Sequence, residues 1–383
     1  MLKENNMEVP LLRLDYTDEE ISEIKSEIEK VLRSGYLTMA ERVKEFEELF
    51  ASYCNTRFAL GTNSGTSALE IALRAVDVEG GTVVLPSNTY MATPLATIKA
   101  GASVVFTDCE RSNLQMDPDD LKNKIREDTK AVILVHIGGI ISPRLKEIQE
   151  VCSEHEIPLI EDAAHAHGAM IDGRMAGSLG LAGAFSFYPT KVLTSAEGGM
   201  LVTDSENIYK KGTILREHGK ADHRYNIHTE IGDNWRFSEL HAVLGIQQMK
   251  KAHLILAERR RLAKLYDTLL EKVPGIKKVK IPPHIHSAYY KYIAFLPDGI
   301  HRQDVKDRLK KDFNVMLTGE VYSDPCHNQP VFQKYPEKKA NKPGDSFPNT
   351  DYVCQQHICL PLYPGLKDEE ADYVVSCLQK VIE

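Results

Sequence analysis

The chain has 383 residues, of which 42% are hydrophobic and 27% charged, with 24 glycines and 18 prolines. This length and composition are typical of a globular protein of two domains, and they exclude a disordered, collagen-like or disulfide-scaffold chain. The 47 basic and 55 acidic residues leave a net charge of −8, which provides no basic surface for nucleic acid or for an anionic membrane.

Cysteine content and the N-terminal sequence bear on the compartment of the protein. The seven cysteines form no CxxC pair, and an odd, scattered set is typical of reduced thiols in a cytoplasm. The N-terminal sequence contains no continuous apolar segment of the kind found in a signal peptide. No stretch approaches the roughly 18 apolar residues of a membrane-spanning helix. We therefore expect a cytoplasmic protein without a membrane span.

An amphipathic helix is expected near the start of the chain. Thr17 followed by Glu20 is a capping box, and Gly35 marks the end of the helix. Apolar residues recur between them at helical spacing, at Ile21, Ile24, Ile28, Val31 and Leu32. Such a stripe needs a surface to pack against.

Short β-rich segments then alternate with helical patterns. Strands are expected at residues 58–60, 82–85, 103–108, 131–137 and 158–160, and helices at about 64–76, 93–100, 118–125 and 143–155. Segments such as AVILVHI are apolar on both sides, as in a buried parallel sheet, and strand–helix alternation is typical of βαβ units. The pattern predicts an α/β fold, with a mostly parallel sheet covered by helices on both faces.

The pattern changes after residue 182. Two short strands, GAFSFYP and GGMLVTD, follow each other without a helix between them, which predicts that a functional loop joins them. A helical stretch at about 237–273, a strand at 289–296 and helices at about 304–311 and 368–382 predict a smaller α+β domain, with a surface loop at about 334–348. We expect a large domain over residues 1–250 and a small C-terminal domain over residues 251–383.

Polar residues directly after strands are candidates for a site, because ligands of open α/β sheets gather at the carboxyl ends of the strands. The segment NSGTS at residues 63–67 lies between a strand and a helix. Its helix-start N–H groups, its hydroxyls and Gly65 suit a phosphate dianion. The same residues also suit an ordinary helix N-cap.

A second candidate is the acidic pair Glu161 and Asp162 at the end of the strand PLI, followed by His165 and His167. A carboxylate at the end of a buried strand needs a partner, and a cationic ring nitrogen, a salt bridge or a cap would each serve. The two histidines have the spacing to bind a metal, but no third ligand is evident. Packed or hydrogen-bonded rings are the simpler interpretation, and we expect no metal.

The third candidate is Lys191, in the loop between the two strands of residues 182–203. A lone lysine is usually a surface charge, but apolar β-segments flank this one, and desolvation would lower its pKa towards nucleophilic use. A phosphate cradle, an acidic group for a ring nitrogen and a buried lysine are the three groups that a pyridoxal phosphate site requires.

Nine stretches spread from about residue 35 to residue 365 carry a resemblance to a known family. They are SGYLTMAERVKEFEELFA, TNSGTSALEIALRA, VVLPSNTYMAT, VHIGGI, IEDAAHAHGA, GAFSFYPTK, EGGMLVTD, GDNWRFSELHAVLGIQQM and LPLYPGL. In this order they resemble the DegT/DnrJ/EryC1/StrS family, sugar aminotransferases of the aspartate aminotransferase fold (fold type I). The resemblance implies that fold and pyridoxal 5′-phosphate as the cofactor.

The resemblance also implies roles for individual residues. Lys191 stands at the position of the lysine that forms the Schiff base with the cofactor, and Asp162 at that of the carboxylate paired with the pyridine nitrogen, so both are implied to be catalytic. Gly65, Thr66 and Ser186 match positions that bind the cofactor phosphate.

Four further residues follow from the same resemblance. Tyr90 matches an aromatic residue that stacks on the cofactor ring, and His165 stands where many members have Gln, from where it would contact the cofactor. Asn234 matches an asparagine that reaches the phosphate of the neighbouring subunit's cofactor, which implies a homodimer with shared active sites. His327 resembles the family's small-domain histidine near the sugar. After Lys191, VLTSAEGG replaces the commoner Asn-Leu-Gly pattern.

The implied reaction transfers an amino group from glutamate or glutamine to a keto sugar, specifically a nucleotide-linked keto-deoxysugar, during polysaccharide, glycan or antibiotic synthesis. A branch of the family that replaces the lysine with His performs dehydration, and Lys191 argues against that branch. The sequence leaves open a keto-cyclitol or a free keto sugar acid as the acceptor. It also leaves open a non-catalytic regulatory homologue that binds the cofactor.

Overall fold

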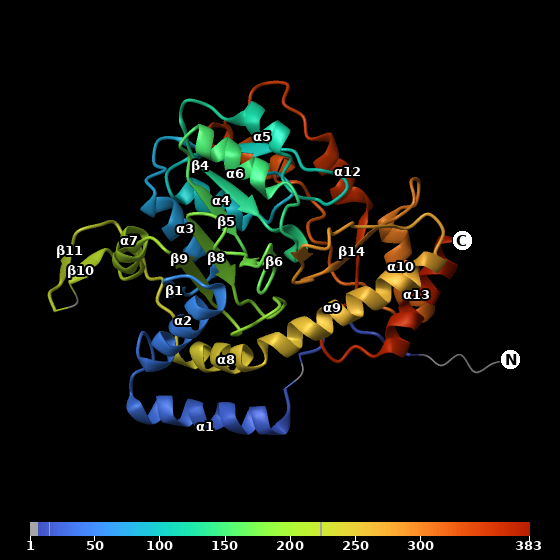
Figure 1. Ribbon diagram of the computed structural model, residues 1–383, viewed down its shortest axis with the longest axis horizontal. Helices are drawn as coiled ribbons and strands as arrows, with labels where there is room; N and C mark the ends of the chain where they lie inside the picture. Colours follow the sequence, from blue (N-terminus) through green and yellow to red (C-terminus); the bar gives the residue numbers. More distant parts are fainter. Residues whose placement is uncertain (1–6, 15, 223) are drawn as a thin grey trace.

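The computed structural model describes residues 7–14, 16–222 and 224–383. A seven-stranded sheet in the order β1-β9-β8-β5-β4-β2-β3 forms its centre (Figure 1). The strands are β1 Phe58–Thr62, β2 Thr82–Pro86, β3 Ser103–Thr107, β4 Thr129–Val135, β5 Leu159–Asp162, β8 Ala182–Ser186 and β9 Gly199–Thr203. In this sheet β9 pairs antiparallel with both of its neighbours, and the other pairs are parallel. The predicted α/β fold class is confirmed.

Helices cover both faces of the sheet because its strands are apolar on both sides. Along β2 and β4, Val84 and Val132 face one layer, whereas Val83 and Ile133 face the other. The first layer consists of α2 Glu41–Cys54, α5 Pro118–Lys124, α6 Leu145–Glu154 and α8 Glu239–Lys250. The second layer consists of α3 Gly65–Ala75, α4 Ala92–Lys99 and α7 Glu206–Arg216.

A second, antiparallel sheet belongs to the C-terminal part of the chain. Its strands, in spatial order, are β12 Lys277–Lys278, β14 Tyr292–Phe295 and β15 His357–Leu360. With α9 Ala252–Leu269, α10 Arg302–Phe313 and α13 Asp368–Ile382 it encloses an apolar cluster of its own, on the right in Figure 1. The predicted division between residues 250 and 251 falls between α8 and α9, and as a domain boundary it stays a prediction.

The remaining elements are short. They are the strands β6 Met170–Ile171, β7 Arg174–Met175, β10 Lys220–Asp222, β11 Ile227–His228 and β13 Ile285–His286, the helices α11 Pro330–Lys334 and α12 Pro348–Gln356, and 3₁₀ turns at Ile137–Gly139, Leu270–Lys272, Cys326–Asn328 and Pro336–Lys338. β10 and β11 form a hairpin that projects beside α7 at the left of Figure 1.

Two segments differ from the sequence-based expectation. The helical stretch expected at 237–273 is two helices, because Lys251 leaves the helical conformation at φ −112°. The surface loop expected at 334–348 covers the edge of the large sheet: the N–H of Ala340 donates to the carbonyl of Val104 at 2.8 Å, and the Asn341 amide bonds both backbone groups of Phe106 at 2.9 Å. An edge strand with unpaired backbone groups needs such a cover.

The first helix, α1 Asp18–Ser34, has the capping box predicted at Thr17 and Glu20. It lies along α8 (Figure 1), where the carboxylate of Glu23 accepts a hydrogen bond from the amide of Gln247 at 3.1 Å. Its apolar stripe is covered only in part, since Ile21 is 38% exposed and Leu32 is 58% exposed. The expectation that the stripe packs against a surface is therefore met only in part within one chain.

A fully buried carboxylate holds the end of β5 in place. Glu161 Oε1 accepts hydrogen bonds from the N–H groups of Leu179 and Gly180, both at 2.7 Å. Its Oε2 accepts from the N–H of Gly177 at 2.7 Å and lies 2.8 Å from His136 Nε2. This network joins β5, the residue after β4 and the loop before β8, so it fixes the strand ends where a ligand would bind.

We predict that Glu161→Ala lowers the free energy of unfolding by about 3–5 kcal/mol, because several buried donors would lose their acceptor at once. Denaturant unfolding followed by circular dichroism would measure the change. Glu150→Ala, on the exposed side of α6, is the matched control and should change stability by less than about 0.5 kcal/mol. A Glu161→Ala protein as stable as this control would contradict the prediction.

Candidate active site

The carboxyl ends of β1, β5 and β8 meet at one edge of the large sheet, because the reversed strand β9 lies between β1 and β8. A cavity of about 440 Å³ opens there. Seven of the nine predicted site residues line it, and these are Gly65, Thr66, Tyr90, Asp162, His165, Ser186 and Lys191.

The phosphate cradle predicted at residues 63–67 is the start of α3. Ser64 is the N-cap residue, and its Oγ accepts a backbone N–H of the first turn at 3.1 Å. The N–H groups of Gly65 and Thr66 have no partner within the helix and carry the positive end of its dipole. A β-carbon at Gly65 would lie 2.9 Å from the Ser186 β-carbon, so the absence of a side chain lets the helix start reach the end of β8. The N-cap role of Ser64 thus leaves two donors for an anion.

Asp162 is fixed by hydrogen bonds and faces the cavity. Its Oδ2 accepts a hydrogen bond from Thr93 Oγ1 at 2.8 Å, and its Oδ1 accepts one from the N–H of Ala164 at 3.2 Å. The Thr93 hydroxyl is itself 2.8 Å from Thr89 Oγ1. Because successive side chains of a strand point to opposite faces, Glu161 serves the buried network while Asp162 serves the cavity.

Lys191 lies in the loop between β8 and β9, as predicted, and its ammonium is 4.9 Å from the centre of the Tyr290 ring. Burial lowers the pKa of Lys191 to about 8. The charge of Asp162 acts in the opposite direction, and the ammonium of Lys291 adds to the lowering. At pH 7 about a tenth of the population therefore carries a neutral, nucleophilic amine, far more than for an exposed lysine.

Three aromatic rings and one imidazole form a wall of the cavity. The His165 ring is stacked on Tyr290 with a centroid distance of 3.9 Å and faces Tyr322 at 5.7 Å. The Tyr322 ring in turn lies 6.4 Å from that of Tyr90, nearly parallel to it. Burial holds the pKa of His165 well below its ordinary value, so the ring is neutral. Its Nδ1 is buried and has no hydrogen-bond partner within the described part of the chain.

Two predicted residues do not line the cavity. Asn234 is exposed, and its carbonyl accepts a hydrogen bond from the Asn63 amide at 3.1 Å. His327 lies against the end of β2, where its Nδ1 is 2.7 Å from Ser87 Oγ and its Nε2 is 3.4 Å from Asp351. The roles implied for these two residues, in a partner's site and in sugar binding, stay predictions.

His167 is separate from the cavity and packs among aromatic side chains of the core. Its ring lies 5.2 Å from that of Phe185 and 5.1 Å from that of Phe187. Over residues 7–14, 16–222 and 224–383, no group of three His, Cys, Asp or Glu side chains is arranged to hold a metal ion.

Sequence reasoning missed four residues around the cavity. Thr93 orients Asp162, and Tyr290, Glu320 and Tyr322 come from the C-terminal part of the chain to line the pocket. Thr93 stands in VVLPSNTYMAT, so the motif contained it without indicating its partner. The other three follow no motif, and only the packing of β14 and its neighbours against the large sheet brings them to the cavity.

Comparison with known proteins identifies the family. The profile of the DegT/DnrJ/EryC1/StrS aminotransferase family matches residues 18–379. This chain belongs to that family.

Relatives of this family member include curated and solved proteins. GDP-perosamine synthase of Vibrio cholerae is 30% identical over 349 residues, which cover 90% of this chain and 92% of that protein. The crystal structure of S. venezuelae DesV in complex with a ketimine intermediate has a TM-score of 0.90 at 29% identity and covers 98% of this chain and 99% of the other. The PLP form of Spr1654 from Streptococcus pneumoniae, a putative sugar aminotransferase, has a TM-score of 0.87 at 26% identity and covers 98% and 99%.

These comparisons confirm the resemblance found in the sequence and the assignment of the chain as an aminotransferase family member. The family's fold is also that of this chain, because the structural matches extend over nearly its whole length. The predicted lysine and aspartate lie together in one cavity at the expected edge of the sheet.

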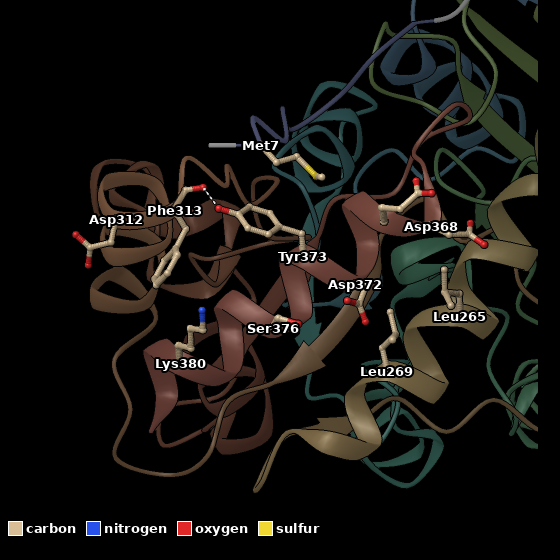
Figure 2. Close-up of a pocket in the computed structure, with 11 residues that line it drawn as sticks. Met7, Leu265, Leu269, Asp312, Phe313, Asp368, Asp372, Tyr373, Ser376 and Lys380 are labelled. Carbon is tan, nitrogen blue, oxygen red and sulfur yellow. Dashed lines mark hydrogen bonds between the residues drawn. The ribbon is translucent and has the colours of Figure 1, made fainter. Parts of the chain in front are cut away.

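A second groove of about 660 Å³ lies between α9, α10 and α13 (Figure 2). Apolar side chains such as Leu269 and Phe313 line it together with acidic ones such as Asp372. None of the predicted site residues lines this groove, so we assign the active site to the cavity at the sheet edge.

None of the described helices is long and apolar enough to cross a membrane.

We predict that the reactivity of Lys191 rises through about pH 8. Below this pH most of its amine is protonated and unreactive, and above it the free amine dominates. An exposed lysine passes through the same transition only near pH 10.4. Competitive acetylation of the cofactor-free protein, with each site quantified by mass spectrometry, would give the pH midpoint. A midpoint for Lys191 equal to that of the exposed lysines would contradict the prediction.

Proposed function

We propose that this protein transfers an amino group from glutamate or glutamine to a nucleotide-linked keto-deoxysugar, with pyridoxal 5′-phosphate as its cofactor. The observation that supports this most directly is the meeting, in one cavity, of Lys191, whose pKa is lowered to about 8, with Asp162 and the helix-start cradle. These are the groups that hold, protonate and react with the cofactor.

The residues present fit pyridoxal phosphate. The N–H groups of Gly65 and Thr66 and the Ser186 hydroxyl would hold the phosphate. The Asp162 carboxylate, fixed by two hydrogen bonds, would hold the ring nitrogen, and the partnerless Nδ1 of His165 offers a polar contact to the ring. When bound, the cofactor supplies an aldehyde that condenses with amines and a ring that takes up an electron pair.

Lys191 and its surroundings account for proton transfer. Its neutral Nζ would hold the cofactor through its aldehyde group, and when the lysine is free the same Nζ would remove the proton from the donor's α-carbon. In the second half-reaction Nζ delivers a proton to the former ketone carbon of the sugar. The rings of Tyr290 and Tyr322 line the space in which this proton transfer would occur.

The choice of a nucleotide-linked acceptor rests on a relative. The Vibrio cholerae protein is named for GDP-perosamine, a sugar carried by a nucleotide. A cavity of about 440 Å³ would be taken up by the cofactor and the keto sugar, so a nucleotide would extend outwards from it. A cytoplasmic location agrees with the unpaired state of the cysteines.

A homodimer is supported by apolar residues left on the surface. Tyr225, Ile227 and Ile231, on and beside the projecting hairpin of β10 and β11, are 58%, 61% and 87% exposed. Asn234 follows in the same segment, so a second subunit covering these side chains would have its active site within reach of Asn234. This supports the proposal that the dimer shares its active sites.

The first test of the proposed function uses the absorbance of the protein with pyridoxal phosphate. Wild-type protein should show a visible Schiff-base band that excess glutamate or glutamine replaces by a near-ultraviolet band. Lys191→Ala should lose the visible band and reduce transamination at least about a thousandfold, because the general base and the covalent anchor are both removed. Thr97→Ser on α4, outside the cavity lining, is the control and should keep both. Normal turnover by Lys191→Ala would refute the assignment.

Ile231→Asp should weaken the dimer at least about tenfold, since a charge would be buried in the proposed interface. Sedimentation velocity over a range of protein concentrations would measure this weakening. The matched control is Tyr335→Asp, which changes an exposed tyrosine directly after α11. This variant should leave the dimer intact. A wild-type protein that sediments as a monomer at all concentrations would refute the proposed dimer.

A further inference from the structure

Lys291 follows Tyr290, a residue of the cavity lining, although no motif marks it and it is not itself among the lining residues. It directly precedes β14, in which Tyr292 and Ala294 pack into the small apolar core and Ile293 packs into the core of the large sheet. Because side chains alternate along a strand, Lys291 shares the side of Ile293 and points towards the large sheet.

The side chain of Lys291 lies against the same ring as Lys191. The Lys291 ammonium is 5.2 Å from the centre of the Tyr290 ring, and that of Lys191 is 4.9 Å from it. Tyr290 lines the cavity and stacks on His165. The two ammonium groups are therefore separated by no more than the sum of these two distances, a span over which the amine and a carboxylate of one amino acid could lie.

Lys291 has no acidic partner in the part of the chain that the structure describes. Glu320, the nearest carboxylate that acts on it, is already 2.9 Å from the ammonium of Lys306 and 3.7 Å from the guanidinium of Arg302. Burial lowers the pKa of Lys291, and the buried guanidinium of Arg259 adds to this lowering. A desolvated cation without a partner is costly to a folded protein, and an anionic ligand would offset that cost.

We propose that Lys291 binds a carboxylate of the amino donor and so sets the donor's position before Lys191. This proposal rests on the proposed function. An amino acid whose amine reaches Lys191 would bring a carboxylate to Lys291 on the Tyr290 side of the cavity. The diphosphate of a nucleotide-linked sugar carries the same kind of charge, but it lies between the sugar and a nucleoside that must extend out of the cavity, which places it nearer the mouth.

The test measures carboxylate binding directly. Glutarate, an unreactive dicarboxylate, is titrated into the cofactor-loaded protein by calorimetry. Lys291→Met should weaken its binding about tenfold to a hundredfold, the range expected for the loss of one charge-assisted hydrogen bond. Lys291→Arg should restore most of the affinity because it restores the charge. Lys280→Met, the same change at an exposed lysine outside the cavity, should bind glutarate as the wild type does.

Two further measurements separate the alternatives. GDP, UDP and dTDP are titrated in the same way. If Lys291→Met loses nucleotide binding but binds glutarate as the wild type does, Lys291 binds the acceptor's diphosphate and the proposal is overturned. Unchanged glutarate binding, or no glutarate binding by the wild type, would also overturn it. Lys291→Gln replaces Lys291→Met if the latter does not fold. The visible band reports on Lys191, and Lys291→Met should keep it, so failure of the proposed function and failure of this inference are distinguishable.

Discussion

The active site depends on how closely the turn after β1 approaches the start of β9. A β-carbon at Gly199 would lie 2.2 Å from the carbonyl carbon of Ser64, a distance that no side chain tolerates. Gly199 pairs with Thr62 on one side and with Ser186 on the other. The turn therefore lies over Gly199, and the start of α3 comes to rest beside the end of β8. The proposed phosphate cradle and the loop that carries Lys191 become neighbours through this contact.

Positive charge exceeds negative charge around the ring of Tyr290, where the side chains are largely buried. Two lysines lie against the ring of Tyr290, and burial lowers the pKa of each. Asp162 offsets part of this charge from a position fixed by Thr93. The protein thus holds a reactive amine and a second cation ready for anionic ligands, and a phosphate or a carboxylate would complete the electrostatic balance.

The cavity joins the two parts of the chain. The large sheet supplies Asp162, Lys191 and the helix-start cradle, and the C-terminal part supplies Tyr290 and Tyr322. Arg260 of α9 strengthens this junction, because its guanidinium donates to the carbonyl of Gly168 in the large part at 2.8 Å. Packing between the parts therefore decides how the aromatic wall faces Lys191.

Local patterns in the sequence determined the α/β fold, the position of most strands and helices, and most of the predicted residues of the cavity, to which the family resemblance added Tyr90. Those residues follow strands directly, and strand ends of a parallel sheet meet at one edge whatever the details of packing. The break at Lys251, the edge cover by residues 339–341, and the partner of Glu161 were decided only by the tertiary structure. The same holds for Tyr290, Lys291 and Tyr322. These depend on contacts between segments far apart in the chain, and no periodicity or spacing encodes which distant surface a side chain meets.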